Sequence, residues 1–152
     1  MRKQLFATAG LSLGITLSAA GDTWYVDDSV STSGDGSGWT QAFKTLQEGL
    51  AEANAGDEIR VAQGIYKPGT SQGDTFELLE DVDVIGGWAG LGASNPDDYD
   101  PALYVTILSG NIGNAGDETD NSYIVVTAND TDIGRQQNRR VELTLVPLTL
   151  ET

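Results

Sequence analysis

Short apolar segments recur along this chain at nearly regular intervals, and their spacing limits the folds open to it. The segments are Trp24-Tyr25-Val26, Ile59-Arg60-Val61, Val82-Asp83-Val84-Ile85, Val105-Thr106-Ile107-Leu108 and Ile124-Val125-Val126. Each has the length and β-branched content of a strand and is bounded by Gly, Asp, Asn or Pro. From Ile59 the segments start 23, 23 and 19 residues apart, with no two-residue hairpin turn between them. This recurrence predicts a solenoid of stacked coils rather than an antiparallel meander.

One α-helix is predicted between Thr45 and Gly56. Thr45 and Glu48 have the spacing of a capping box, in which each side chain accepts from the other residue's backbone amide. One face of the helix is apolar and contains Leu46, Leu50 and Ala53. Gly49 inside the helix costs about 1 kcal/mol relative to Ala, so the helix depends on packing. Gly56 suits the left-handed position that ends a helix. We expect this helix to cover the open end of the solenoid.

The first twenty residues have the order of a secretory signal peptide. A short basic start, Met1 to Gln4, precedes an apolar run from Leu5 to Leu17 and the small residues Ser18 to Gly21. The apolar run has about 13 residues, too few for the ~20 that a membrane-spanning helix needs. We therefore expect export, with residues 1–20 removed and no membrane-spanning segment in the mature protein.

Charge and composition exclude several classes of function. Removal of Arg2 and Lys3 leaves six basic residues against 23 acidic ones, a net charge of −17. Such a surface repels nucleic acid and anionic lipid. The chain contains neither Cys nor His, which excludes disulfides, the usual zinc sites, a cysteine nucleophile and a Ser-His-Asp triad. No cofactor is expected, although oxygen ligands leave Ca²⁺ open.

The charge balance changes near Ile133. Residues 21–132 have a net charge of −18, whereas residues 133–152 have a net charge of +1. Val141, Leu143 and Leu145 alternate with polar residues in this tail, which is typical of a half-buried strand. The predicted organisation is a signal peptide at 1–20, a main region at 21–132 and a distinct tail at 133–152.

The main region resembles the N-terminal capping region of secreted bacterial right-handed parallel β-helix proteins of the pectate-lyase-like and polymorphic-outer-membrane-repeat groups. The similar segments include Trp24-Tyr25-Val26-Asp27, Gly34-Asp35-Gly36-Ser37-Gly38-Trp39, Ala42-Phe43-Lys44-Thr45-Leu46-Gln47, Gly56-Asp57-Glu58-Ile59-Arg60-Val61-Ala62, Gly64-Ile65-Tyr66, Ile85-Gly86-Gly87-Trp88, Thr106-Ile107-Leu108-Ser109-Gly110 and Asp120-Asn121-Ser122-Tyr123. The resemblance implies an all-β right-handed parallel β-helix of few coils with one capping α-helix. It implies no reaction, because this superfamily contains enzymes, adhesins and scaffolds.

The tail is similar to the end of OmpA-like peptidoglycan-binding domains. The similarity covers Gly134-Arg135-Gln136-Gln137-Asn138-Arg139-Arg140-Val141-Glu142-Leu143-Thr144-Leu145-Val146-Pro147. The segments with which that family binds the peptidoglycan peptide have no counterpart here. The tail implies a Gram-negative envelope but carries over no binding residue.

Asp81, Asp83 and Arg60 are the weak catalytic candidates. Asp81 and Asp83 flank Val82 on a predicted strand, which would direct both carboxylates outward and about 6.6 Å apart. That separation fits an inverting glycosidase, although we favour a solvated acidic face. A lyase would need a basic proton acceptor from Lys44, Arg60 or Lys67. For Arg60 we favour an ion pair with Asp57 or Glu58.

Two further sets of side chains suggest ligands. Acidic loops supply weak Ca²⁺ candidates, but none has the spacing of an EF-hand; the candidates are Asp97, Asp98, Asp100, Asp117 and Asp120. Aromatic residues offer a surface for stacking sugars, although we favour packing roles; they are Trp24, Trp39, Trp88, Tyr66, Tyr99 and Tyr104.

Together these features predict a secreted or cell-surface scaffold or adhesin-like protein without its own catalytic site. Its expected partners are polysaccharide or other components of a Gram-negative envelope. Two alternatives remain open at this point: a polysaccharide lyase or glycosidase, and a peptidoglycan-associated outer-membrane protein.

Overall fold

The computed structural model describes residues 21–114 and 116–128. In chain order the elements are β1 (Thr23–Val26), the 3-10 turn η1 (Trp39–Gln41), α1 (Leu46–Glu52), β2 (Glu58–Ala62), β3 (Gly64–Tyr66), β4 (Phe76–Leu78), β5 (Asp83–Trp88), β6 (Thr106–Leu108), the 3-10 turn η2 (Glu118–Asp120) and β7 (Val126–Ala128). The predicted signal peptide and the predicted tail both lie outside the described residues.

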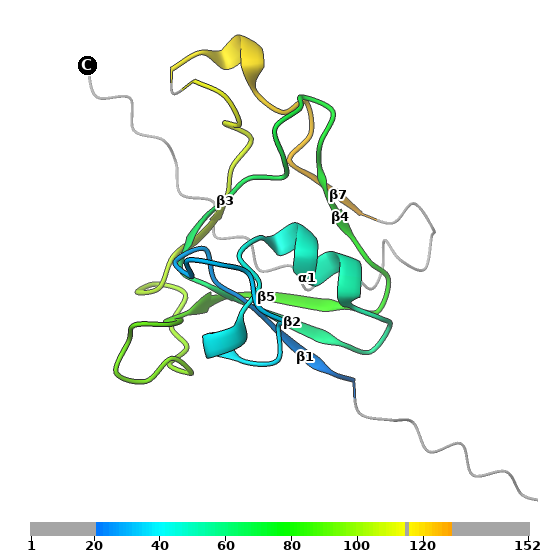
Figure 1. The fold of residues 1–152 in the computed structure, drawn as a ribbon. Coiled ribbons are helices and arrows are strands. Elements are labelled where there is room, and N and C mark those ends of the chain that lie inside the picture. Colours follow the sequence, from blue (N-terminus) through cyan, green and yellow to red (C-terminus); the bar gives the residue numbers. More distant parts are fainter. Residues whose placement is uncertain (1–20, 115, 129–152) are drawn as a thin grey trace, which may run out of the picture.

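The strands form three separate parallel sheets. The first has the order β1-β2-β5, and the other two pair β3 with β6 and β4 with β7 (Figure 1). In the first sheet Tyr25 lies beside Arg60, and Arg60 lies beside Ile85. Parallel neighbours need long connections, which agrees with the wide spacing of the strands along the chain.

The predicted right-handed parallel β-helix, with its apolar segments stacked in a single column, is wrong. β2 and β5 do pair, but β6 pairs with β3 and β7 pairs with β4. The short strands β3 and β4 were not predicted. The backbone groups of β6 and β7 form their hydrogen bonds with these two strands. Gly64, with φ of +153°, turns the chain from β2 into β3 in a conformation that L side chains rarely adopt. The described chain is therefore a small fold of two- and three-stranded parallel sheets with one helix.

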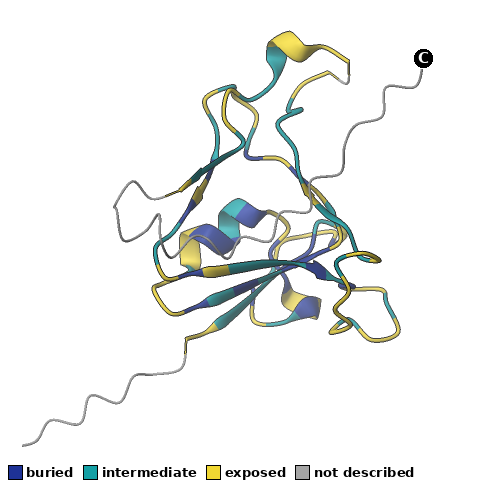
Figure 2. Ribbon diagram, turned by 180° about the vertical axis from the view of Figure 1, so that it is seen from behind, coloured by how far each residue is buried: buried dark blue, intermediate teal, exposed yellow. Residues whose placement is uncertain are grey.

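The hydrophobic core lies where the three sheets and α1 meet. Alternate residues of β2 and β4 face inward, so Ile59, Val61, Phe76 and Leu78 are buried (Figure 2). The same cluster contains Val26, Phe43, Leu46, Leu50, Tyr66 and Val82. Each sheet alone is too small to bury a face, so all three depend on this shared core.

The helix α1 begins as the sequence predicts. Thr45 accepts from the Glu48 amide and the Glu48 side chain accepts from the Thr45 amide, which confirms the capping box. Leu46 and Leu50 are buried, and the helix contacts β1, β2 and β4. The helix ends at Glu52, earlier than predicted, and Gly56 instead has φ of +96° in the turn before β2.

Gly49 has a packing role that its helix propensity does not reveal. A Cβ atom at this position would lie 2.9 Å from Val26 Cγ2 and 3.4 Å from Ile59 Cγ2. Both neighbours are completely buried and cannot easily move away. The glycine therefore allows α1 to approach β1 and β2 closely.

The seven-residue helix α1 is far shorter than a bilayer is thick. Within the described ranges, no helix has the length and apolar character needed to cross a membrane.

Candidate functional site

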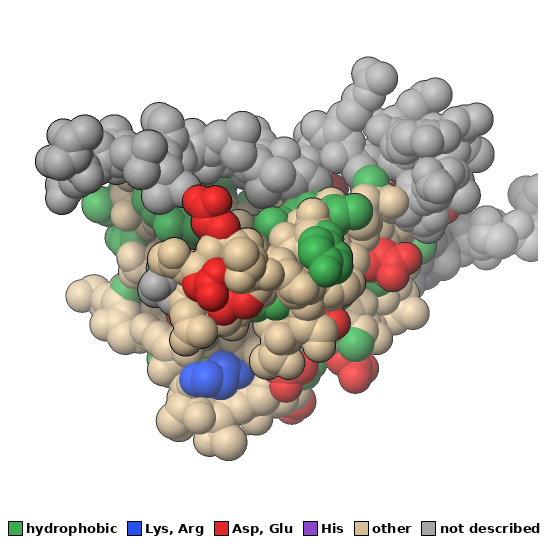
Figure 3. Space-filling view, turned by 90° about the horizontal axis from the view of Figure 1, so that it is seen from above, with side chains coloured by type: hydrophobic (Ala, Val, Ile, Leu, Met, Phe, Trp, Pro, Cys, Tyr) green, Lys and Arg blue, Asp and Glu red, His purple; other side chains and the backbone are tan. Residues whose placement is uncertain are grey.

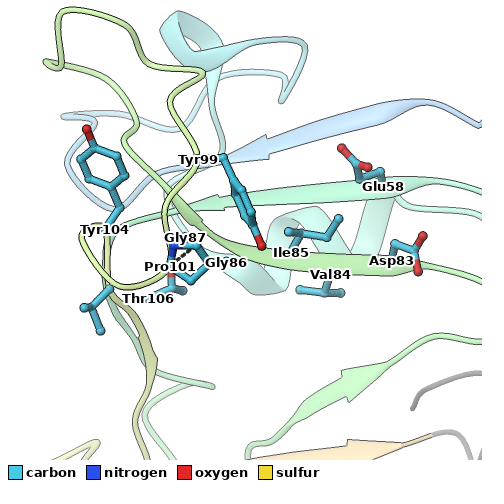
Figure 4. Close-up of a pocket in the computed structure, with 11 residues that line it drawn as sticks. Glu58, Asp83, Val84, Ile85, Gly86, Gly87, Tyr99, Pro101, Tyr104 and Thr106 are labelled. Carbon is cyan, nitrogen blue, oxygen red and sulfur yellow. Dashed lines mark hydrogen bonds between the residues drawn. The ribbon is translucent and has the colours of Figure 1, made fainter. Parts of the chain in front are cut away.

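A groove with a volume of about 330 Å³ runs along β5, the edge strand of the three-stranded sheet. Residues 83–87 form one side of the groove, and the segment from Tyr99 to Thr106 forms the other. Figure 4 shows the Tyr99 hydroxyl directed toward Ile85, with the carboxylates of Glu58 on β2 and Asp83 on β5 beyond it. The volume is at the lower end of the range of roughly 300–1,000 Å³ that is usual for small-molecule sites.

Two adjacent glycines allow the loop to lie against β5. A Cβ atom on Gly86 would lie 2.8 Å from Thr106 Cβ, and one on Gly87 would lie 2.9 Å from Pro101 Cα. Gly87 also has φ of +99°, which favours glycine. Its amide donates to Thr106 Oγ1 at 3.0 Å, and its carbonyl accepts from the Asp100 amide at 3.0 Å. These contacts hold the two sides of the groove together.

Beside the groove lies a group that we call the aromatic–arginine cluster: Tyr25, Trp39, Arg60, Trp88 and Tyr99. The Arg60 guanidinium carbon is 4.4 Å from the centre of the Trp88 ring and 5.7 Å from that of Tyr25. The Trp88 and Tyr99 rings are 5.0 Å apart, and the Tyr25 and Trp39 rings are 4.9 Å apart. These distances are typical of cation–π and aromatic pairs. The cluster holds Tyr99 in place although 47% of that residue is exposed.

Arg60 is engaged by acidic groups. Its Nε atom donates to Glu58 Oε1 at 2.5 Å, which is one of the two ion pairs that the sequence predicts, and its NH1 atom lies 3.7 Å from Asp97 Oδ1. Partial burial acts to lower the pKa of Arg60, but the hydrogen bond and charge of Glu58 outweigh it, so the pKa is raised. Arg60 therefore remains a cation, which is unsuited to accept a proton. The other predicted bases lie elsewhere: Lys44 Nζ donates to the carbonyls of Asp28 and Val30, and Lys67 is exposed.

The prediction that Asp81 and Asp83 share a strand is wrong. Asp83 begins β5, but Asp81 lies in the preceding turn with φ of +59°. The chain turns there from β4 into β5, which belong to different sheets, and Asp tolerates this left-handed conformation better than most residues. Both carboxylates are exposed, and of the two only Asp83 lines the groove.

The predicted Ca²⁺ ligands do not converge. Asp97 accepts from Trp39 Nε1 at 2.9 Å, Asp98 accepts from the Asn95 side chain, and Asp100 accepts from the Ala102 amide at 3.0 Å. In the other loop, Asp117 accepts from the Thr119 amide and Asp120 from the Asn114 amide. Among the residues described, no three acidic side chains gather into a group that could hold a metal ion.

The predicted aromatic candidates have different positions. Trp39 and Tyr66 are buried, and burial raises the pKa of Tyr66, whose hydroxyl donates to the Ala62 carbonyl. Trp24 is half-buried, and its indole donates to Asp57. Tyr99 and Tyr104 line the groove.

Sequence reasoning missed Glu58 and Thr106 as residues of the groove. A signal for Glu58 was present, because it precedes Ile59 as Asp83 precedes Val84, and these two pairs are in register across β2 and β5. Thr106 had no comparable signal, since its role depends on the close approach of Gly86 and Gly87.

The chain was compared with known protein families, proteins and structures. No protein-family model, curated protein or solved structure matches this chain.

Proposed function

We propose that this chain is an exported protein of the cell surface or its surroundings, which contacts carbohydrate without transforming it. The carrying observation is the half-exposed Tyr99 ring, which the aromatic–arginine cluster fixes beside a groove lined at its far end by Glu58 and Asp83. The exposed tyrosine offers an apolar face for the C–H groups of a sugar ring, and the carboxylates offer hydrogen-bond acceptors for its hydroxyl groups.

A sugar has apolar C–H faces and a rim of hydroxyl donors. An aromatic ring with a polar tip, such as that of Tyr99, can pack against the former and hydrogen-bond at its edge. Carboxylates accept strong hydrogen bonds from hydroxyl groups, and Glu58 and Asp83 lie on neighbouring strands. β5 is an edge strand, so its outward backbone groups, apart from those of Gly87 that bond Thr106 and Asp100, are further partners for a ligand.

The engagement of Arg60 supports a non-catalytic role. General base catalysis needs a group that can lose and accept a proton near the working pH. Arg60 is fixed as a cation by Glu58 and Asp97, and Asp81 lies in a solvent-exposed turn.

Replacement of Tyr99 tests the sugar site. Tyr99→Ala should weaken binding about tenfold or more, because an anchored aromatic side chain commonly contributes 1–2 kcal/mol or more at a binding surface. The assay is depletion of the mature protein from solution by insoluble cellulose, xylan and chitin, with titration calorimetry on their soluble oligomers.

Tyr123→Ala is the matched control, since Tyr123 is 76% exposed and does not line the groove. The proposal fails if wild-type protein stays in solution with every polysaccharide, or if the two variants bind equally well. Release of reducing ends or unsaturated products would contradict the non-catalytic part.

Export is tested by the N-terminus of the natural protein. Removal of residues 1–20 should produce a mature chain that begins at Gly21. Intact-mass measurement of protein from the producing cell's envelope and medium checks this. Recovery of the protein in the cytoplasm, still beginning at Met1, would contradict export.

A further inference from the structure

The charged side chains that line the groove on β5 are acidic. They are Glu58 and Asp83, and the lining residues within the described part of the chain include neither Lys nor Arg. The two residues are register partners on β2 and β5. Neighbouring strands lie about 4.8 Å apart, so the two side chains leave the same face of the sheet next to each other. Together they make one end of the groove negative (Figure 4).

Glu58 and Asp83 differ in how far their charges are already paired. Glu58 accepts from Arg60 Nε, which offsets its charge. Asp83 is exposed and forms no ion pair within the described ranges. The Arg60 guanidinium lies over the Trp88 ring, and Arg60 does not line the groove. Asp83 is therefore the charge that a ligand in the groove can use.

The side-chain hydrogen-bond donors of the groove are neutral. Thr106 Oγ1 already accepts from the Gly87 amide and donates to the Ala62 carbonyl. The other lining residues with side-chain donors are Tyr99 and Tyr104, each with one hydroxyl group. Carboxylate and sulfate groups of sugars are bound most strongly by charged donors, which the groove lacks. An anionic sugar would instead meet two like charges, so the groove disfavours it.

We propose that the groove selects cationic amino sugars and that Asp83 determines this specificity. The proposal rests on the proposed function, since it names the class of sugar for the same groove. Asp83 and Ile85 are two residues apart on β5 and so about 6.6 Å apart, which is the scale of a single sugar residue. The Tyr99 hydroxyl points toward Ile85. A glucosamine ring packed on Tyr99 can therefore direct its protonated amine to Asp83.

The charge of the whole chain favours the same class of ligand. The mature chain has a net charge of −17, and Figure 3 shows more acidic than basic side chains on the face that it presents. Such a field attracts cations and repels anionic polymers such as polyuronates. This attraction is diffuse and acts on any cation, so the experiment must separate it from the contact with Asp83.

The test is titration calorimetry on the mature full chain at about pH 6, where aliphatic amines are protonated. The ligands are soluble oligomers of β-1,4-linked glucosamine, N-acetylated oligomers of the same length, and oligogalacturonate. Wild type should bind the glucosamine oligomer about three- to fivefold more tightly than the uncharged N-acetylated one, the effect of an exposed ion pair, and oligogalacturonate most weakly. Asp83→Asn should remove most of this preference without weakening the N-acetylated oligomer. NaCl at about 0.5 M should also reduce it, since salt screens exposed charges.

Asp81→Asn is the matched control. It removes the same charge two residues away, from an exposed carboxylate that does not line the groove, and should leave the preference unchanged. The specificity proposal is overturned if Asp81→Asn lowers the preference as much as Asp83→Asn does, because the attraction would then be diffuse. It is also overturned if wild type binds the two oligomers equally.

The Tyr99→Ala variant separates this proposal from the proposed function. Equal binding of the two oligomers that Tyr99→Ala still weakens would overturn the specificity and leave the sugar site standing. A preference that Asp83→Asn removes, in binding that Tyr99→Ala does not weaken, would support the role of Asp83 and contradict the aromatic site. Binding of neither oligomer would overturn the specificity, and the polysaccharide panel described above would decide the proposed function separately.

Discussion

Phe76→Ala should lower the free energy of unfolding by about 3–5 kcal/mol, the cost typical of removing a buried aromatic side chain. Phe76 is completely buried in β4, and its strand contacts both α1 and β7. The variant loses the transfer free energy of the ring and leaves a cavity where the helix and the sheets meet. Urea unfolding followed by tryptophan fluorescence measures the change, and the protein's three tryptophans provide the signal.

Glu77→Ala is the control for this prediction. Glu77 is the next residue of the same strand but faces solvent, so its replacement should change stability by less than about 0.5 kcal/mol. Equal effects of the two substitutions would show that Phe76 does not occupy the shared core.

Asp57→Asn should destabilise the protein by about 2–4 kcal/mol at neutral pH. Asp57 is buried, with 6% of the residue exposed, and its carboxylate joins the start of β1 to the turn before β2. It accepts from the Asp22 amide at 2.8 Å, from Trp24 Nε1 at 3.0 Å and from the Asn54 amide at 2.9 Å. Hydrogen bonds to a charged acceptor contribute about 1.5–3 kcal/mol each, and the asparagine NH₂ group would face donors.

The effect of Asp57→Asn should depend on pH. Hydrogen bonds from the Asn54 amide and the Trp24 indole hold the pKa of Asp57 below its ordinary value of 3.8. Because the pKa is lower in the folded state, the carboxylate's contribution is complete above the unfolded value and is lost as pH falls through the folded one. The difference in unfolding free energy between wild type and variant should therefore be constant near neutrality and shrink below about pH 4.

Asp81→Asn is the comparison for the pH profile. Asp81 is an exposed carboxylate in the turn before β5, and Asn tolerates the same left-handed backbone. Urea unfolding at several pH values from 2.5 to 7 should show a profile close to that of wild type. A pH-independent cost of Asp57→Asn, or no cost at all, would contradict the role assigned to this carboxylate.

The candidate sites were only partly predictable from the sequence. Arg60 was expected to pair with Asp57 or Glu58, and it pairs with Glu58, because side chains two residues apart lie on the same face of a strand. The groove was not predictable. Its second side is the loop that contains Tyr99, and this loop lies against β5 only because Gly86 and Gly87 have no side chains.

Features that depend on neighbours in sequence were determined by the sequence alone. The Thr45–Glu48 capping box spans three residues, and the inward and outward alternation of β2 follows from strand geometry. Both involve contacts whose geometry the local backbone dictates. Contacts between residues that are close in sequence are therefore enough to define where the helix begins and which strand residues enter the core.

The tertiary structure alone decided which strands pair and what several residues do. Several short parallel strands of similar composition are alternative partners, and the choice depends on which backbone edges are free once the chain has turned at Gly64. Helix propensity alone makes Gly49 a destabilising residue of α1, whereas in the structure the absence of a Cβ atom there leaves room for Val26. Strand pairing and the packing role of Gly49 both depend on contacts between residues that are far apart in the chain. No local sequence pattern predicts such contacts.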